Sequence, residues 1–352
     1  MHLDKALTAP FAAATAVGLD GAIHAHRRII EMDVNGHEML VQRARDMLDR
    51  LLLRGVLAVR SHVNVGEGLG LLHLAAMLEA AVPFRHLMEI QIVAMAHTPL
   101  AGGAGAGNRA LLRQALSDLQ LDGIGGCPHL DADPEGALEE LFAIAADTGL
   151  PLDLHTDETL DPKVFTVPSL ARLTERANMQ GRVVASHCVS LGMQPAEVQT
   201  DAARALASAG VGVVTLPQTN LFLNAVGVRT APPRGLAPAA VLLDAGVVVA
   251  AGSDNLQDPF NPVGDADPLH TASLMVTAGH QLPDVAMAMV SDSGRMLMGL
   301  PASGPHPGRT ADLVALPPAD NAATIADCSA DRMVFHRGRL VASTSVVETV
   351  FR

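Results

Sequence analysis

Short apolar runs alternate with longer segments of helical period along most of the chain. The apolar runs predict seven strands, at 56–65, 86–97, 121–128, 151–156, 182–187, 211–216 and 247–253. Apolar residues three and four apart predict helices at 37–54, 68–82, 108–119, 134–148, 164–179, 194–209, 236–245, 266–280 and 283–299. Strands that alternate with helices are typical of βαβ units in a parallel sheet.

The number and order of these strands favour a closed barrel. An eighth strand would end at His2, so the chain starts at the tip of its first strand. We therefore predict an α/β fold, a (β/α)₈ TIM-like barrel whose first strand is largely missing. The rival is a doubly wound sheet. That fold would need a nucleotide-binding loop. The only glycine-dense loop of this chain, residues 102–107, has neither a P-loop Lys-Ser/Thr nor the full G-x-G-x-x-G spacing.

The last part of the chain has a different pattern. Ala311–Leu316 and Met333–His336 predict strands without the long helices that follow the earlier strands. We therefore expect a barrel over residues 1–308 and a small C-terminal β appendage, the remnant of a small β-sandwich, over 309–352.

Polar residues gather where the predicted strands end. In Leu152–Glu158, Asp153 and His155 share one face of the strand, and Glu158 can reach the same point only from a following loop. Other strand ends carry a His or an Asp: His62, His97, His129, His187 and Asp254. A single histidine there is usually a capped or solvated side chain. Six such ends indicate one common site at the carboxyl edge of the barrel.

Composition and charge narrow the partners and the compartment. The 352 residues carry a net charge of −13, which argues against nucleic acid or an anionic membrane as partner. No apolar run reaches the ~18 residues of a membrane span, and Met1–Lys5 does not open a signal peptide. Cys127, Cys188 and Cys328 are far apart and predict a reduced, cytoplasmic protein without disulfides. The sequence is compatible with a homo-oligomer.

These strand ends resemble the amidohydrolase superfamily, in the branch that contains bacterial cytosine deaminase and N-isopropylammelide hydrolase. The motifs that carry the resemblance occur in the family's order: His2-Leu3-Asp4-Lys5, Ser61-His62-Val63-Asn64-Val65, Pro128-His129, His155-Thr156-Asp157-Glu158, Ser186-His187 and Gly252-Ser253-Asp254-Asn255.

The resemblance implies one divalent metal ion, Zn or Fe, with His2, His155 and Asp254 as ligands. It implies His187 as a further ligand or a hydrogen-bond partner at the reacting water, and Glu158 as the residue that shuttles protons. Asp254 would accept the proton of the attacking water. The residues expected to bind substrate are His62, Asn64, His97, His129, Asp157, Asn255 and Phe260.

The chain also departs from the family's pattern. The first His of the family's His-x-His pair would precede Met1, which implies weakened metal binding because even a lost supporting contact costs about 10–100-fold in affinity. His97 stands where cytosine deaminase has a glutamine, and Asn64 and Asn255 stand where it has aspartates. These three exchanges imply a pocket for a related ring in place of cytosine.

Two further observations bear on the metal. Binuclear members of the superfamily use a carboxylated lysine at the fourth strand end, where this chain has Cys127-Pro128-His129. Neither Lys5 nor Lys163 is near, so a single ion is expected. His24-x-His26 lies in a predicted helical region, where residues two apart do not share a face, so this pair is not expected to bind metal.

The predicted function is that of a metal-dependent hydrolase or deaminase that uses activated water to cleave a C–N bond of a cyclic amidine or amide in a small nitrogen heterocycle. One alternative is a hydrolase that releases an N-alkyl amine from a triazine-type ring or opens a cyclic amide. The alternative from another class is a metal-poor, inactive barrel that acts only as a binding module.

Overall fold

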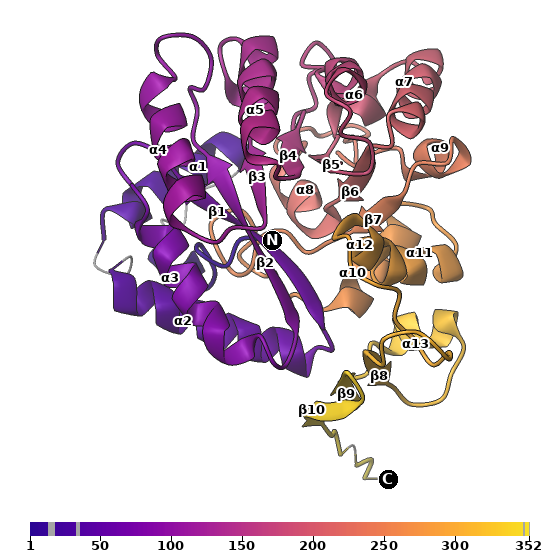
Figure 1. Ribbon diagram of the computed structural model, residues 1–352. Helices are drawn as coiled ribbons and strands as arrows, with labels where there is room; N and C mark the ends of the chain where they lie inside the picture. Colours follow the sequence, from indigo (N-terminus) through magenta and orange to yellow (C-terminus); the bar gives the residue numbers. More distant parts are fainter. Residues whose placement is uncertain (13–17, 33–35, 348, 352) are drawn as a thin grey trace.

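Seven parallel strands form one curled sheet in chain order, from β1 to β7, in the computed structural model (Figure 1). The structure describes residues 1–12, 18–32, 36–347 and 349–351, so positions 348 and 352 of the predicted appendage lie outside it. The strands are β1 Ala58–Val65, β2 Glu89–Ala96, β3 Gly123–Gly126, β4 Leu152–Thr156, β5 Val183–His187, β6 Gly212–Thr215 and β7 Val249–Ala251. All seven predicted strands are present, each shorter than predicted at one end or at both.

Among the described residues, two α-helices precede β1, and the others follow the strands; most of them surround the curled sheet (Figure 1). They are α1 Gly18–Ile30, α2 His37–Leu53, α3 Leu72–Ala81, α4 Ala106–Asp118, α5 Pro134–Thr148, α6 Val167–Arg176, α7 Ala196–Ser208, α8 Pro217–Leu223, α9 Ala239–Asp244, α10 Pro268–Thr277, α11 Pro283–Met289, α12 Asp292–Leu297 and α13 Asn321–Asp327. Local signals set their ends. Asp133 caps α5 through Gly136 N, and Gly149 ends it in a left-handed conformation.

The predicted helix 283–299 is wrong as one element, because it divides into α11 and α12. The backbone at Ser291 leaves the helical region, with φ −128° and ψ −93°. The Ser291 hydroxyl donates to Met287 O at 2.7 Å, which satisfies a carbonyl at the end of α11. Hydrophobic period alone could not reveal this break.

Met1 and His2 lie between the two edges of the curled sheet. Met1 N donates to Arg60 O at 3.0 Å, and His62 N donates to Met1 O at 2.8 Å, which is the ladder of a parallel pair with β1. On the other side, His2 N donates to Asp254 O, just after β7, at 3.2 Å. The two residues occupy the place of the first barrel strand. The predicted TIM-like α/β fold, with that strand largely missing, is confirmed.

The barrel interior contains a group of four polar side chains, which we call the inner floor: Arg60, His62, Asp153 and Ser186. Asp153 accepts from Arg60 Nη1 at 2.8 Å and from Ser186 Oγ at 3.1 Å. His62 Nε2 lies 3.3 Å from the same carboxylate. The hydrophobic core around it is built mainly from Leu, Val, Ala, Ile and Met, with Phe84, Phe142 and Cys188.

A small antiparallel sheet follows the barrel in the order β10-β9-β8: β8 Leu313–Ala315, β9 Arg332–His336 and β10 Arg339–Thr344. The strands predicted at 311–316 and 333–336 are thus present. Arg332 joins this sheet to the barrel by donating to the Asp267 carboxylate at 2.7 Å. The division at 308/309 stays a prediction. Of the helices in the described ranges, none is long and apolar enough to cross a bilayer.

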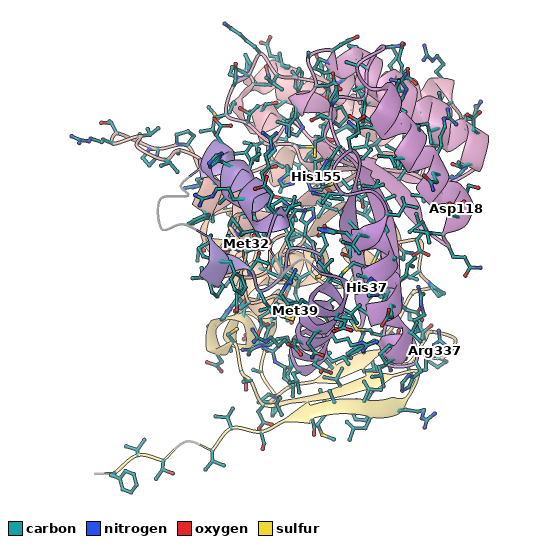
Figure 2. All side chains as sticks on the ribbon, turned by 90° about the vertical axis from the view of Figure 1, so that its left-hand side faces the viewer. Met32, His37, Met39, Asp118, His155 and Arg337 are labelled. Carbon is teal, nitrogen blue, oxygen red and sulfur yellow. The ribbon has the colours of Figure 1, made fainter. Side chains whose placement is uncertain are left out.

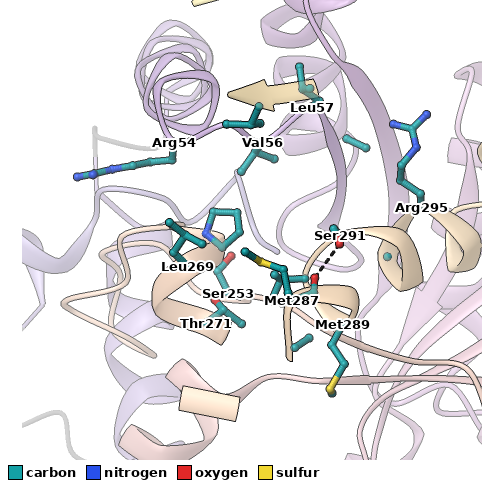
Figure 3. Close-up of a pocket in the computed structure, with 18 of the residues that line it drawn as sticks. Arg54, Val56, Leu57, Ser253, Leu269, Thr271, Met287, Met289, Ser291 and Arg295 are labelled. Atoms are coloured by element: carbon teal, nitrogen blue, oxygen red, sulfur yellow. Dashed lines mark hydrogen bonds between the residues drawn. The ribbon is translucent and has the colours of Figure 1, made fainter. Parts of the chain in front are cut away.

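A cavity of about 410 Å³ lies where the barrel meets this small sheet (Figure 3). Its lining is mostly apolar and comes from the start of β1, the end of β7 and the helices α10 to α12, with Leu269, Met287 and Met289 among the side chains. None of the predicted site residues is among the described residues that line it. The candidate site therefore lies elsewhere.

Candidate active site

Four of the predicted site residues converge at the carboxyl edge of the sheet. His155 is on β4, His187 ends β5, Asp254 follows β7 and His2 lies between the sheet edges. His2 Nε2 lies 3.1 Å from His155 Nε2 and 3.3 Å from Asp254 Oδ1, and His187 Nε2 lies 3.9 Å from Asp254 Oδ2. All four are buried, and Figure 2 shows His155 in the interior of the molecule. The structure thus brings together residues from both ends of the barrel sequence.

The spacing of three of these side chains suits a small cation. Ligands of tetrahedral zinc at bond lengths of about 2.0–2.1 Å are about 3.3 Å apart. The donor atoms of His2, His155 and Asp254 lie within 4.8 Å of one another. The separations of His2 Nε2 from His155 and from Asp254, 3.1 and 3.3 Å, are close to the spacing of zinc ligands. Two imidazoles and a carboxylate are a usual donor set for a catalytic metal.

Hydrogen bonds and burial hold the imidazoles in a form that suits metal binding. His2 Nδ1 lies 3.1 Å from the carbonyl of His62 and 2.9 Å from Lys5 Nζ, and these contacts leave Nε2 facing His155 and Asp254. Burial, and then the charge of Lys5, lower the pKa of His2 to about 4. Burial, and then the charges of neighbouring histidines, lower the pKa of His155 well below its usual value. Both rings are therefore neutral at pH 7, as a metal ligand must be.

Glu158 and His187 form a second pair beside this cluster. Glu158 Oε1 lies 3.3 Å from His187 Nδ1. Asn220, in the middle of α8, donates from Nδ2 to the same ring nitrogen at 3.0 Å and lies 3.4 Å from Glu158 Oε1. Because His187 Nδ1 accepts this bond, its Nε2 carries the hydrogen and faces Asp254. His187 is therefore arranged as a hydrogen-bond donor.

The pKa values of the two carboxyl groups of the site are shifted in opposite directions. Burial, and then the negative charge of Asp254, raise the pKa of Glu158 well above its usual value. Burial opposes ionisation of Asp254 as well, but the hydrogen bond from His2 and the charges of His187 and His2 outweigh it and hold its pKa low. Two carboxyl groups pushed apart in this way can act as an acid and a base.

The backbone is strained where two of these residues leave their strands. His187 has φ 70° and Asp254 has φ 62°, in the left-handed region that side chains with a Cβ rarely adopt. Each such conformation costs about 1–2 kcal/mol. The strain turns both side chains toward one point. Strain of this kind is commonly found at functional sites.

A cavity of about 510 Å³ opens above the cluster. Its polar lining includes His2, His155, Glu158 and Asp254, and the buried ammonium of Lys5. Helix α1 closes one side of it. The volume is that of a small-molecule site.

Comparisons with known proteins agree with this geometry. A family model described as "Amidohydrolase family" matches residues 72–352. The chain belongs to the amidohydrolase family. A pterin deaminase of Rhizobium rhizogenes is 34% identical over 223 residues, 62% of this chain and 51% of its own length. The N-isopropylammelide isopropyl amidohydrolase of a Pseudomonas species is 25% identical over 319 residues, 88% of this chain and 75% of its own.

Solved structures of this family share the fold over nearly the whole chain. A 5-methylcytosine deaminase from Klebsiella pneumoniae, liganded with phosphonocytosine, has a TM-score of 0.88 and 25% identity, covering 99% of this chain and 86% of its own. An N-isopropylammelide isopropylaminohydrolase from Burkholderia multivorans has a TM-score of 0.83 and 28% identity, covering 97% and 84%. Against the pterin deaminase, by contrast, this amidohydrolase chain spans about half of the relative's length.

The residues predicted to bind substrate fall into two groups in this amidohydrolase. Four of them line the cavity: Asn64, His97, Asn255 and Phe260. The other three, His62, Asp157 and His129, lie outside its lining. His62 belongs to the inner floor, and Asp157 accepts from Thr166 N at 2.7 Å at the start of α6. His129 Nδ1 lies 3.1 Å from the carbonyl of His155. These three side chains contact the strands and helices that surround the site, and they do not line the cavity.

Sequence reasoning did not identify three residues of this site. Lys5 Nζ lies 2.9 Å from His2 Nδ1 and 3.3 Å from Asn64 Oδ1. Its position three residues after His2 in His2-Leu3-Asp4-Lys5 was a usable signal. Asn220 carried none, because it lies on a short helix that hydrophobic period did not predict. His26 was considered only as a ligand; it is not among the groups that could hold a metal within the described residues, but it lines the cavity.

Proposed function

We propose that this chain is a metal-dependent hydrolase that cleaves a C–N bond of a cyclic amidine or amide in a small nitrogen heterocycle. One observation carries the proposal: two imidazoles and a carboxylate converge at the spacing of metal ligands, beneath a cavity that is also lined by Glu158, whose pKa is raised by burial. The similarity to deaminases and amidohydrolases of such heterocycles supports it.

His2, His155 and Asp254 would hold one divalent ion, Zn or Fe. The ion supplies Lewis acidity, which makes attack by water possible at neutral pH. Asp254, whose low pKa keeps it ionised, accepts the proton of the attacking water. Burial raises the pKa of Glu158, which lines the cavity, so it can give a proton to a ring nitrogen. It would regain a proton from the hydroxyl group added to the attacked carbon and pass that proton to the leaving amine, and the proton held by Asp254 would then restore Glu158.

The remaining polar residues would stabilise and orient the substrate. His187 Nε2 is aimed at the Asp254 side of the site and can donate to the negative charge that develops on the attacked group. Lys5 adds the one buried ammonium of the cavity among the described residues that line it. Burial, and then the charge of Lys5, lower the pKa of His97 to about 4, so its ring is neutral and can both donate and accept.

Metal analysis and a substrate panel test the proposal together. The purified protein is reconstituted with Zn²⁺ or Fe²⁺ and dialysed, and its metal content is measured. It is then assayed for release of ammonia or an alkylamine from cytosine, pterin and N-isopropylammelide. We expect about one equivalent of metal and amine release from at least one ring. A protein that retains no metal and releases no amine would support the metal-poor binding module.

A second candidate is release of an N-alkyl amine from a triazine-type ring. The observation that favours it is the cavity of about 510 Å³, which has room for an alkyl substituent beside a single ring. The similarity to N-isopropylammelide hydrolases points the same way. Alkylamine release without ammonia release in the same panel would select this candidate, and formation of a ring-opened product would select cyclic amide hydrolysis.

A further inference from the structure

Helix α1 presents one face to the cavity above the candidate metal site. Leu19, Ile23, His26 and Ile30 follow the three- and four-residue spacing of one helix face, and all four line the cavity. Three of them are apolar. His26 is the polar member, and its side chain is 7% exposed.

Neither ring nitrogen of His26 has a hydrogen-bond partner among the described residues. The ring packs edge-on against Phe260, with centroids 5.9 Å apart and an interplanar angle of 63°. The Phe260 side chain has no nitrogen or oxygen atom that could hydrogen-bond to the imidazole. A buried polar group without a partner destabilises the folded protein, and such groups are rare in native structures. The position of His26 is therefore unfavourable unless something else in the cavity bonds to it.

Helix α1 also contributes the exposed Asp20, His24 and Arg27 to the cavity lining, whereas the buried polar group in the loop after β7 is already satisfied. Asn255 donates from Nδ2 to Asp258 at 2.8 Å, and its Oδ1 lies 3.4 Å from the Thr219 hydroxyl. A ligand that extends toward α1 and the loop after β7 therefore meets the apolar ring of Phe260 and the unpartnered imidazole of His26. Burial lowers the pKa of His26 well below its usual value, so the ring offers one donor and one acceptor.

We propose that His26 is a specificity-determining residue, which binds the part of the heterocycle that lies farthest from the reacting carbon. Its neutral ring would hydrogen-bond a ring N–H, an exocyclic amino group or a carbonyl, while Phe260 packs on the apolar face of the same ligand. The substrate class is thus a flat heterocycle with hydrogen-bonding atoms on the edge opposite the scissile C–N bond. This inference rests on the proposed function for the identity of the ligand.

Substitutions of His26 separate a ligand contact from a packing role. H26F keeps a ring against Phe260 and removes both nitrogens. H26Q and H26M are matched in length, and only the glutamine can hydrogen-bond. Arg28→Gln, on an exposed position of α1 outside the cavity lining, is the control.

The measurements are thermal unfolding, metal content, kcat and KM. Binding of pterin and cytosine is followed by calorimetry on zinc-loaded protein that also carries E158Q, so that no turnover interferes. In H26F and H26M we expect KM and the calorimetric Kd to rise about 10-fold, the gain expected of one hydrogen bond in a buried site. We expect kcat and metal content to stay within about twofold, and H26Q to recover most of the affinity. H26F should unfold at the same or a higher temperature, because an apolar ring replaces an unpartnered polar one.

Wild-type affinity in both H26F and H26M would overturn the proposal and make His26 a packing residue. This outcome differs from failure of the proposed function. A wild-type protein that binds a heterocycle but releases no amine loses the hydrolase assignment, while the affinity comparison still decides the role of His26. A wild-type protein that binds neither probe overturns the assignment of His26 as a heterocycle contact.

Discussion

At the scale of single residues, the surroundings of Glu158 and Asp254 set their separate roles. Both carboxyl groups are buried, but only Asp254 has imidazoles on both sides of it. Glu158 has the amide of Asn220 and one nitrogen of His187, and it faces the charge of Asp254. Identical chemical groups thus differ in protonation because of what each contacts.

Replacing Glu158 with Gln tests the proton shuttle. A glutamine side chain cannot release or take up a proton, so we expect kcat to fall by about 10²–10⁴-fold, the usual contribution of general acid–base catalysis. We expect unchanged metal content, because the proposed ligands are His2, His155 and Asp254. A loss of metal would instead select Glu158, His187 and Asp254, the second group whose atoms could hold an ion. Glu175→Gln, an exposed change on α6, is the control. Full activity of E158Q would remove Glu158 from the mechanism.

Asn220 is expected to position Glu158 and His187. Its Nδ2 is shared between the two side chains, so N220A removes one hydrogen bond from each of them. We expect kcat to fall by about 10-fold or more, with unchanged metal content and little change in KM. The control is Asn224→Ala, one turn later, whose side-chain amide donates to the carbonyl of Asn220. Equal kinetics of N220A and the wild type would contradict this role.

The cysteines are expected to be unreactive in the folded protein. Burial, and then the charge of Glu158, raise the pKa of Cys127 to about 12; burial raises that of Cys328 to about 11 and that of Cys188 well above its usual value. Since the thiolate is the reactive form, iodoacetamide at pH 8 should modify all three much more slowly than in denaturant. Mass spectrometry gives the count. Rapid alkylation of native Cys127 would contradict the high pKa of that thiol.

At the scale of elements, the loop after β7 carries three residues of the cavity wall, Asp254, Asn255 and Phe260, and is held by Asp258. This buried carboxyl accepts from Asn255 Nδ2 and from Phe260 N, both at 2.8 Å, and from Asn261 N at 3.2 Å. Asp157 does the same at the start of α6. In both places a short polar side chain shapes the backbone that follows a strand.

Asp258 makes stability depend on pH in a direction opposite to that of a paired carboxylate. Burial raises its pKa to about 7 against the hydrogen bonds that favour its ionised form. A raised pKa means that its contribution to stability is complete below about pH 4 and is lost as pH rises to about 7. The asparagine side chain in D258N does not titrate. The free energy of unfolding of D258N minus that of the wild type should therefore increase as the pH rises over that range, by at most about 1.4 kcal/mol per pH unit. Urea unfolding at several pH values measures this. A constant difference would show that Asp258 titrates normally.

At the scale of the whole molecule, the candidate metal site joins parts of the chain that are far apart in sequence. His2 bonds to residues after β7 and beside β1, and its imidazole meets His155 on β4. An ion bound by His2, His155 and Asp254 would therefore hold the two sheet edges together. Binding to the folded state alone stabilises it by mass action.

Metal removal should for this reason lower the unfolding temperature. With free Zn²⁺ at about 100 times its Kd, the stabilisation is about 2.7 kcal/mol, which is several degrees for a chain of this size. A chelator should abolish this shift in the wild type, and H155N should show little of it. His336, buried in the small sheet, supplies the control, because H336Q should keep the metal-dependent shift even if it unfolds earlier. Identical unfolding with and without chelator would contradict metal binding at this site.

Much of this molecule follows from local sequence pattern. Runs of Val, Ile and Leu between helical segments determined the seven strands, their order and the parallel α/β barrel, because a period of two or of 3.6 residues is a property of neighbours in the chain. The strand-end histidines and Asp254 were also predictable, because barrels carry their sites at that edge. The tertiary structure alone decided which side chains face the cavity. The side chain of His62 belongs to the inner floor and that of Asp157 contacts the start of α6, whereas the side chains of His26, Asn220 and Lys5 lie at the site. Those outcomes depend on contacts between residues that are distant in sequence, and no local period encodes them.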